Sequence, residues 1–155
     1  MLPHSQDYKI KQLHRADYKQ AQALFTLLSA VFETEDKAVL AQDATERLLD
    51  DPSFLVFVAT LAEEVVGGLT AYVLPLYRPP YAEVFIYDIG VSAPHRRNGI
   101  GKKLLVALQD YCSAQVIGSI FVAAHEEDLD AVEFYKGTQG QPERVIHFTY
   151  TSSLK

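Results

Sequence analysis

Residues 92–105, with the sequence "SAPHRRNGIGKKLL", concentrate basic side chains around a Gly-Ile-Gly turn in a chain of net charge −6. At a glycine turn that opens a helix, several backbone N–H groups have no partner, and the positive end of the helix dipole adds to them. A side chain at Gly99 or Gly101 would stand between this backbone and a ligand. The segment therefore predicts a phosphate or pyrophosphate site. The alternative is a glycine turn beside a solvated basic helix start.

The spacing of the same residues excludes two other phosphate-binding motifs. A P-loop needs Gly-x4-Gly-Lys-Ser/Thr, but Arg96 stands in place of the first glycine and Lys103 follows Lys102. A dinucleotide fingerprint needs Gly-x-Gly-x-x-Gly, and "GIGKKL" has no third glycine. The pattern that the segment does contain is Arg-x-x-Gly-x-Gly.

Asp88 is the candidate for acid–base chemistry, because it interrupts an otherwise apolar strand expected over residues 81–91. A buried carboxylate needs a cationic or hydrogen-bonding partner. Gly90 would suit a β-bulge, a device that re-aims side chains beside an active site. The alternative is that Asp88 is a strand-end carboxylate that caps a neighbouring turn.

The composition predicts one domain over residues 1–155, in a chain with 48% hydrophobic and 22% charged residues. Its apolar runs fall short of the roughly 20 residues that span a membrane. The single cysteine, Cys112, cannot form an internal disulfide, so a cytoplasmic location is expected. Twenty acidic against fourteen basic residues favour a cationic partner over nucleic acid.

The elements that position these residues can be read from apolar periodicity, which predicts an α/β fold with a mixed sheet. No internal repeat or linker interrupts it. Strands are expected over residues 8–14, 54–61, 65–75, 81–91, 116–124 and 143–152, and helices over 17–32, 44–49, 100–111 and 128–135. The glycine turn then lies between a strand and a helix.

Arg-x-x-Gly-x-Gly, here residues 96–101, resembles the motif with which the Gcn5-related N-acetyltransferase superfamily holds the pyrophosphate of acetyl-coenzyme A (acetyl-CoA). The order of elements resembles that fold over nearly the whole chain. The resemblance implies a mixed, mostly antiparallel sheet of six to seven strands flanked by about four helices and splayed where the coenzyme binds. It implies these coenzyme-binding residues: Ile89, Val91, Arg96, Arg97, Asn98, Gly99, Ile100, Gly101 and Lys102.

Four segments resemble the aminoglycoside 3-N-acetyltransferases of that superfamily. They are "AYVLP" (71–75), "IYDIGVSAPHRRNGIG" (86–101), "AVEFY" (131–135) and "HF" (147–148). The resemblance implies that acetyl-CoA donates an acetyl group to the 3-amino group of an aminoglycoside antibiotic, by direct attack in a ternary complex, and so confers resistance.

Acetyl transfer from a thioester to an amine needs a deprotonated amine and a protonated leaving thiolate. Asp88 is the expected base, acting directly, through water or by orienting the amine. Tyr135 is the expected acid, since the superfamily places a tyrosine here beside the coenzyme sulfur and a phenol can protonate a thiolate. The alternative is that Tyr135 only packs its helix. The chain departs from the family in "YKGTQGQPE", where the turn after Tyr135 is altered.

Carboxylates are expected to bind the polycationic acceptor. Two acidic clusters, "ETED" (33–36) and "HEEDLD" (125–130), fall where loops line the acceptor side in the superfamily. The alternative is that these loops are simply solvated and that Asp128 caps a helix. His147 could reach the acceptor or belong to the core. The candidate acceptor-binding residues are Asp36, Glu83, Glu126, Glu127 and Asp128.

Two other functions remain open: acetylation of another amine, such as a polyamine, amino acid or protein, and binding of acyl-CoA without turnover. Cys112 has helical spacing from Leu105 and Leu108, so it is expected to be a core residue rather than a nucleophile. No metal is expected, because His125 is a lone loop histidine. Unpaired edge strands would allow a homodimer.

Overall fold

A five-stranded mixed sheet, in the order β1-β2-β3-β4-β5, organises the larger part of the chain. The computed structural model describes residues 6–36 and 38–153. The chain divides into two compact units, residues 1–123 and 124–155. Within the described ranges, no helix is both long and apolar enough to cross a membrane.

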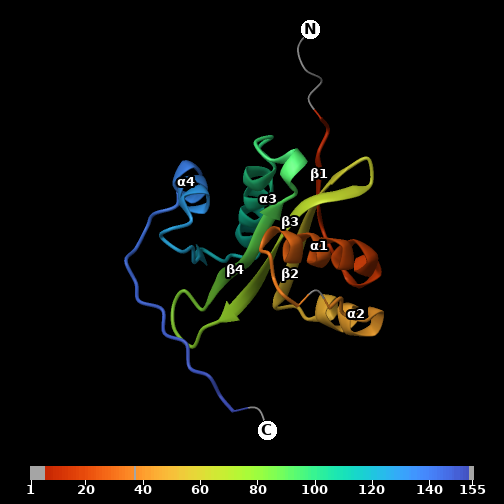
Figure 1. Cartoon of the computed structure of the whole chain (residues 1–155). Helices are drawn as coiled ribbons and strands as arrows, with labels where there is room; N and C mark the ends of the chain where they lie inside the picture. Colours follow the sequence, from red (N-terminus) through yellow and green to blue (C-terminus); the bar gives the residue numbers. More distant parts are fainter. Residues whose placement is uncertain (1–5, 37, 154–155) are drawn as a thin grey trace. The chain divides into compact units, whose positions relative to one another are not determined.

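The first unit carries all five strands and three α-helices, and the second carries the fourth helix (Figure 1). The strands are β1 (Lys9–Gln12), β2 (Phe54–Leu61), β3 (Glu64–Pro75), β4 (Ala82–Val91) and β5 (Ile120–Val122). The helices are α1 (Tyr18–Val31), α2 (Gln42–Asp50), α3 (Ile100–Ala114) and α4 (Leu129–Gly137), with short 3₁₀ turns at Arg15–Asp17 and Ala93–His95.

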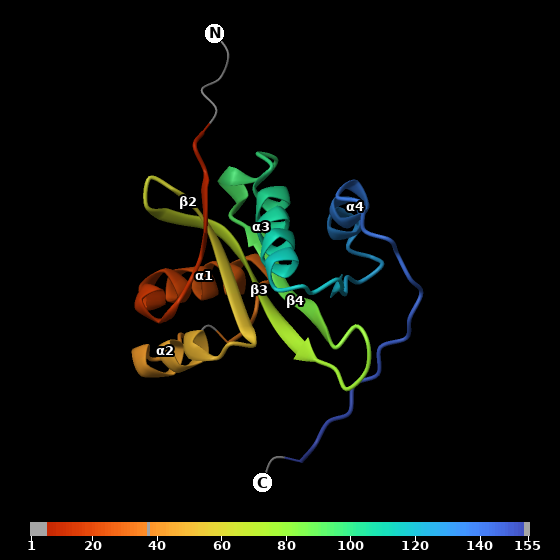
Figure 2. The same ribbon diagram turned by 180° about the vertical axis from the view of Figure 1, so that it is seen from behind.

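The sheet of the first unit has a hydrophobic core on each face. One face packs against α3, and the other packs against α1 and α2, as the two opposite views show (Figures 1 and 2). The α3 face buries Leu55, Phe57, Leu69, Ala71, Val84 and Ile86 of the strands. The α1/α2 face buries Phe54, Val56 and Val58 of β2 together with Leu24, Leu28 and Leu49 of the helices.

The four predicted helices and the first five predicted strands are confirmed, and the sixth strand is wrong. Strands β1 to β4 pair antiparallel and β5 pairs parallel to β4, so the sheet is mixed as expected. Residues 143–152, predicted as a strand from their alternation, form none, and Val145, Ile146, Phe148 and Tyr150 are exposed. Alternation gives a segment β-propensity, but a strand also needs a hydrogen-bonded neighbour. The described sheet therefore has five strands instead of six to seven.

Helix α1 approaches the sheet closely because two glycines face it. Gly68 of β3 and Gly90 of β4 are direct partners in the register. A Cβ built on Gly90 would lie 3.0 Å from Leu28 Cδ2, and one built on Gly68 would lie 2.5 Å from Leu24 Cδ1. The pair therefore leaves room for the leucines of α1 to touch the backbone of the sheet.

We expect Gly68→Ala to lower the free energy of unfolding by about 1–3 kcal/mol, because the new methyl group overpacks a filled site. The methyl would also lie 2.5 Å from the Phe57 carbonyl oxygen, which cannot move without disturbing β2. Urea unfolding measures the change. The matched control is Gly118→Ala, where no atom lies within 4 Å and the expected change is within about 0.5 kcal/mol. Equal stability of the two variants would contradict the close packing of α1.

Candidate active site

One extra residue in β4 decides where Asp88 lies. Thr70 of β3 pairs with Asp88, but its neighbour Ala71 pairs with Ile86, so Tyr87 has no partner of its own. This is a β-bulge, in which two residues of one strand oppose one residue of the other. The sequence predicted a bulge at Gly90, and that position is wrong. Gly90 pairs regularly with Gly68, and its missing side chain instead serves the packing of α1.

The bulge moves Asp88 to the α1/α2 face of the sheet. Ile86 lies in the core on the α3 face, and strict alternation would place Asp88 there too. Because Tyr87 is inserted, Asp88 instead shares a face with its partner Thr70, and Ile89 and Val91 return to the α3 core. The apolar stripe toward α3 thus stays unbroken and the carboxylate leaves it.

The Asp88 carboxylate is half-buried, and burial raises the pKa of this carboxyl group above its ordinary value. Among the described residues it has no hydrogen-bond or ion-pair partner. A carboxylate with a raised pKa accepts a proton more readily than a solvated one, and an unpaired one can receive a cation. The expected turn-capping role of Asp88 is not seen in the structure.

We expect Asp88→Asn to raise the stability of the protein at neutral pH, because it removes a partly buried charge. The pKa of Asp88 is raised in the folded state, so folding is favoured most when the group is protonated. Its destabilising effect is absent in acid below the ordinary carboxyl pKa and is complete above the raised folded pKa. Thermal unfolding measured from acid to neutral pH should show the advantage of Asp88→Asn growing as pH rises. An advantage that does not vary with pH would contradict this assignment.

Strand β4 has a strand neighbour on both sides over only part of its length. Its parallel pairing with β5 covers Val84 to Ile86 and ends there. From Tyr87 to Val91, the described chain provides a strand on the β3 side alone. The backbone of Ile89 and Val91, expected to contact the coenzyme, lies in this one-sided stretch.

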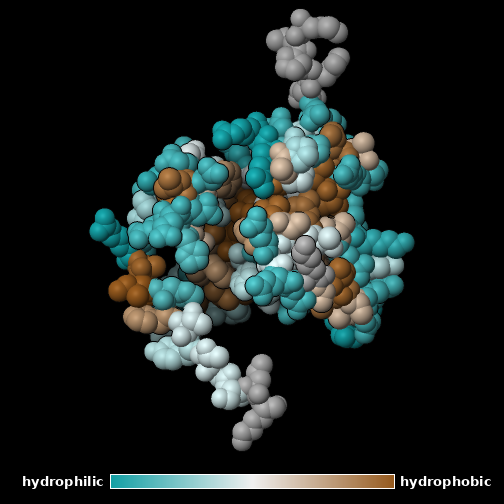
Figure 3. Space-filling view, viewed as in Figure 1, coloured by the Kyte–Doolittle hydropathy of each residue, from teal (hydrophilic) through white to brown (hydrophobic). Residues whose placement is uncertain are grey.

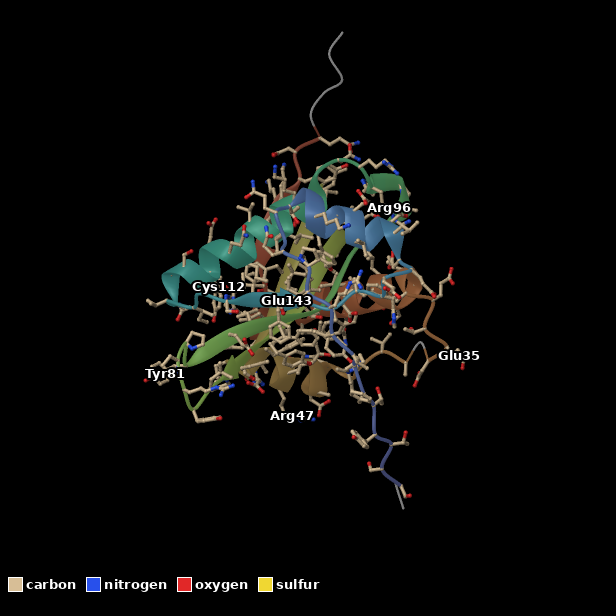
Figure 4. The ribbon with its side chains drawn as sticks, turned by 90° about the vertical axis from the view of Figure 1, so that its left-hand side faces the viewer. Glu35, Arg47, Tyr81, Arg96, Cys112 and Glu143 are labelled. Atoms are coloured by element: carbon tan, nitrogen blue, oxygen red, sulfur yellow. The ribbon has the colours of Figure 1, made fainter. Side chains whose placement is uncertain are left out.

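The loop after β4 presents the features of an anion site. Gly99 is the N-cap of α3 and has φ +74°, a left-handed conformation that glycine adopts without strain. The first helical hydrogen bond runs from the N–H of Lys103 to the carbonyl of Gly99 at 3.0 Å. The N–H groups of Ile100, Gly101 and Lys102 precede that bond, so they lack intrahelical partners. Arg96, Arg97 and Lys102 are exposed around them, and Figure 4 shows Arg96 beyond one end of β4 with Tyr81 at the other.

Side-chain hydrogen bonds hold this loop in shape. The Asn98 amide donates to the carbonyl oxygens of His95 at 3.0 Å and Arg96 at 3.1 Å. Arg96 Nε donates to the Val91 carbonyl at 3.1 Å, which fastens the loop to the end of β4. Arg97 has φ +62°, an uncommon conformation for arginine that such contacts can maintain.

Tyr8 and His95 connect the loop to the start of the chain, and the sequence did not indicate this. The Tyr8 ring packs edge-on against His95 with centroids 5.9 Å apart, and its hydroxyl lies 3.2 Å from His95 Nδ1. The same hydroxyl also bonds the Gln6 side chain. The two residues are 87 positions apart, so no local pattern could have paired them.

We expect Asn98→Ala to raise the KM for acetyl-CoA several-fold while leaving kcat at saturating acetyl-CoA nearly unchanged. The variant removes both hydrogen bonds that preorganise the loop, each worth about 1 kcal/mol. Steady-state kinetics with acetyl-CoA as the varied substrate measures the change. Gln109→Ala, on the exposed side of α3, is the control and should leave both constants as they are. A fall in kcat alone would contradict a binding role.

In the second unit, Tyr135 lies in α4, which has a defined cap at each end. Asp128 is the N-cap, and its carboxylate accepts the N–H of Ala131 at 3.1 Å. At the other end, Gln139 has φ +71° and the N–H of Gly140 donates to the Tyr135 carbonyl at 2.8 Å. This is a Schellman termination, so the altered sequence after Tyr135 ends the helix in an ordinary way. The Tyr135 ring packs edge-on against Phe134 at 5.2 Å.

The predicted acceptor-binding carboxylates are distributed over several elements. Glu83 shares the α1/α2 face with Asp88, but the register separates them by four residues of β3, about 13 Å along the strand. Asp36, after α1, is exposed and accepts the N–H of Ala38 at 2.9 Å. Glu126 and Glu127, in the second unit, are exposed, as is His147. The structure thus brings none of these carboxylates close to Asp88 within the first unit.

Cys112 is confirmed as a core residue. It is 2% exposed in the cluster between α3 and the sheet, and burial raises the pKa of its thiol. A protonated buried thiol is a poor nucleophile. In the ranges that the structure describes, no three histidine, cysteine, aspartate or glutamate side chains gather as metal ligands would.

Tyr72, in the segment "AYVLP" (71–75), lies near Asp88, and the sequence did not indicate a role for it. Burial raises the pKa of its phenol, and electrostatic interactions with the ionisable groups of Tyr87, Asp51 and Asp88 raise it further. The phenol therefore stays protonated and can donate a hydrogen bond. Its proximity to Asp88 depends on the bulge, which the sequence alone misplaced.

An unpaired carboxylate on a strand that leads into a candidate anion-binding loop is an arrangement suited to acyl transfer from a phosphorylated coenzyme. Residues 10–140 match the Acetyltransferase (GNAT) family, and this chain belongs to that family. It is an acetyl-CoA-dependent N-acetyltransferase of the GNAT fold. The loop geometry fits the pyrophosphate of this cosubstrate, which supplies an acetyl group as a reactive thioester.

Among solved structures, the chain is similar to the aminoglycoside acetyltransferase meta-AAC0020 from an uncultured soil metagenomic sample. In its complex with sisomicin, that protein is 35% identical, with a TM-score of 0.90 over 94% of this chain and 97% of that one. The aminoglycoside acetyltransferase HMB0005, also from soil metagenomic material, is 30% identical, with a TM-score of 0.89 over 95% and 99%. The uncharacterized N-acetyltransferase YycN of Bacillus subtilis (strain 168) is 28% identical over 72% of this chain and 74% of that protein.

Proposed function

We propose that this protein transfers the acetyl group of acetyl-CoA to an amino group of an aminoglycoside, with the 3-amino group as the site of acetylation. The observation that carries the proposal is the half-buried, unpaired Asp88 carboxylate on the strand that leads into the anion-binding loop. The similarity to an acetyltransferase crystallised with sisomicin supports the choice of acceptor. Such a reaction would confer resistance to the antibiotic.

The reaction proceeds by direct attack in a ternary complex. The backbone of Ile89 and Val91 and the loop residues hold acetyl-CoA; the loop residues are Arg96, Arg97, Asn98, Gly99, Ile100, Gly101 and Lys102. Asp88 binds the acceptor ammonium group and takes its proton, directly or through water. The free amine then attacks the thioester carbonyl, a C–N bond forms and the C–S bond breaks. Tyr135 gives its phenolic proton to the departing thiolate, and the second proton that the nitrogen loses as the amide forms restores the phenol.

Acidic side chains outside the reacting centre complete the acceptor site. Asp36, Glu126 and Glu127 are exposed carboxylates that can meet the other ammonium groups of the antibiotic. The Asp128 carboxylate already caps α4. Asp128 and Glu83 therefore contribute negative charge to the acceptor site without binding an ammonium group directly. The whole chain acts as one domain, consistent with a family match that extends from the first compact unit into the second. Its proposed location is the cytoplasm.

Thiol release from acetyl-CoA tests the proposal, with gentamicin, sisomicin, spermidine or no acceptor present. We expect turnover with the two aminoglycosides, and NMR of the product locates the new amide on the 3-amino group. No turnover with any aminoglycoside at saturating acetyl-CoA would refute the acceptor. Turnover with spermidine alone would favour a polyamine acetyltransferase, and none with any amine would favour a binding module.

We expect Asp88→Asn and Tyr135→Phe each to reduce kcat by about 100-fold or more, the usual contribution of a general base or acid. Calorimetry should show coenzyme A binding unchanged in both, because neither side chain belongs to the anion-binding loop. Asp110→Asn on the exposed side of α3 and Tyr150→Phe, at a tyrosine that is 91% exposed, are the matched controls. Unchanged turnover in both test variants would refute the assigned roles.

A further inference from the structure

Four aromatic residues lie in register across the sheet and form what we call the aromatic row: Phe54, Tyr72, Phe85 and Phe121. Each is the direct partner of the next, from β2 through β3 and β4 to β5. Directly opposed residues point to the same face of a sheet. Phe54 packs in the core under α1 and α2, so the whole row lies on that face.

The rings of the aromatic row are in contact, and Tyr87 adds a ring to them. Phe54 and Tyr72 have centroids 5.1 Å apart, and Phe85 stacks on Phe121 at 4.9 Å with an interplanar angle of 23°. Tyr87, the bulged residue, packs edge-on against both Tyr72 at 6.0 Å and Phe85 at 5.9 Å. The bulge that turns Asp88 toward this face therefore also brings Tyr87 onto the row.

The row becomes more exposed along its length. Phe54 is 7% exposed beneath the helices, Tyr72 and Phe85 are intermediate, and Phe121 is 42% exposed. Tyr87 is 64% exposed. Figure 3, seen from the same side as Figure 1, shows hydrophobic residues in brown that reach the surface of the protein. Within the first unit, α1 and α2 thus leave the β4–β5 end of the row uncovered.

Polar groups at the uncovered end have no hydrogen-bond partner within the described chain. No hydrogen bond from the hydroxyl of Tyr72 or Tyr87 is found there, and Asp88, on the same face, has no partner. A face that combines aromatic rings, phenol hydroxyls and one carboxylate matches a ligand that is both apolar on one side and cationic. A cation over an aromatic ring is stabilised by the ring quadrupole, in addition to its attraction to a carboxylate.

We propose that Tyr87 and the uncovered end of the aromatic row form the subsite for one aminosugar or aminocyclitol ring of the acceptor. The ring places its C–H face on Tyr87 and Phe85, directs an ammonium group to Asp88 and shares hydroxyl hydrogen bonds with Tyr72 and Tyr87. This inference rests on the proposed function and names the part of the surface that selects a cyclic acceptor. A linear polyamine offers charge but no ring face, so it gains far less from the same surface.

Tyr87→Ala tests the subsite, since an exposed side chain can be truncated with little effect on folding. We expect the KM for gentamicin and sisomicin to rise about tenfold, because the C–H face of the bound ring loses its contact with Tyr87 and the nearby ammonium group loses the attraction of the aromatic ring. The KM for acetyl-CoA should not change. Tyr87→Phe keeps the ring and should weaken acceptor binding by no more than about threefold, from the lost hydroxyl bond. The control is Tyr77→Ala, at a tyrosine that is 89% exposed in the β3–β4 connection and outside the row.

Calorimetric titration of sisomicin into the wild-type protein with coenzyme A present reports the same subsite independently of turnover. If the wild type binds or acetylates aminoglycosides and Tyr87→Ala does so with unchanged affinity, the subsite is overturned while the proposed function stands. If Tyr87→Ala loses thermal stability and keeps its acceptor affinity, the row is a packing surface and the inference also fails. If the wild type neither binds nor acetylates any aminoglycoside, the proposed function fails first.

Discussion

The inserted residue Tyr87 is the constraint on which the site depends. The α3 face of the sheet must stay apolar to pack, and a charged residue two positions after Ile86 would fall into it under strict alternation. The bulge resolves this conflict locally, because the inserted residue shifts the alternation of side chains between the two faces from Asp88 onward. The same strand can then pack against α3 on one face and present a carboxylate on the other, a few residues before it enters the candidate anion-binding loop.

Most of the fold follows from sequence patterns, because its helices and paired strands carry strong periodic signals. The helix of Leu24 and Leu28 and the hairpin of two nearly continuous apolar strands are found where the pattern placed them. The strand predicted over 143–152 is wrong, since its alternation of apolar residues says nothing about a pairing partner. Strand β5 is three residues long, although the strand predicted around it, 116–124, covers nine. The length of a strand depends on how far the neighbouring strand pairs with it, and the sequence alone does not show that length.

Residues of the candidate site that are marked by their type and local spacing could be predicted from the sequence. Features that depend on the register between strands could not. The glycine turn, its basic flanks and Asp88 could be selected from residue types and spacing alone. The face that Asp88 occupies could not, since it depends on which residue of β4 is left unpaired by β3. The link between Tyr8 and His95 and the aromatic row are also products of register and topology, because their members come from distant parts of the chain.

The contact of α1 with the glycine pair at 68 and 90 makes the side chains of the helix and of the sheet depend on each other. A side chain larger than hydrogen at either position requires a smaller residue at Leu24 or Leu28, or a helix displaced from the sheet. In homologous sequences, these four positions should therefore covary, and departures from glycine should coincide with shortened residues on the helix. Because Gly90 lies two residues after Asp88, the tolerance of the helix to substitution is tied to the placement of this half-buried carboxylate.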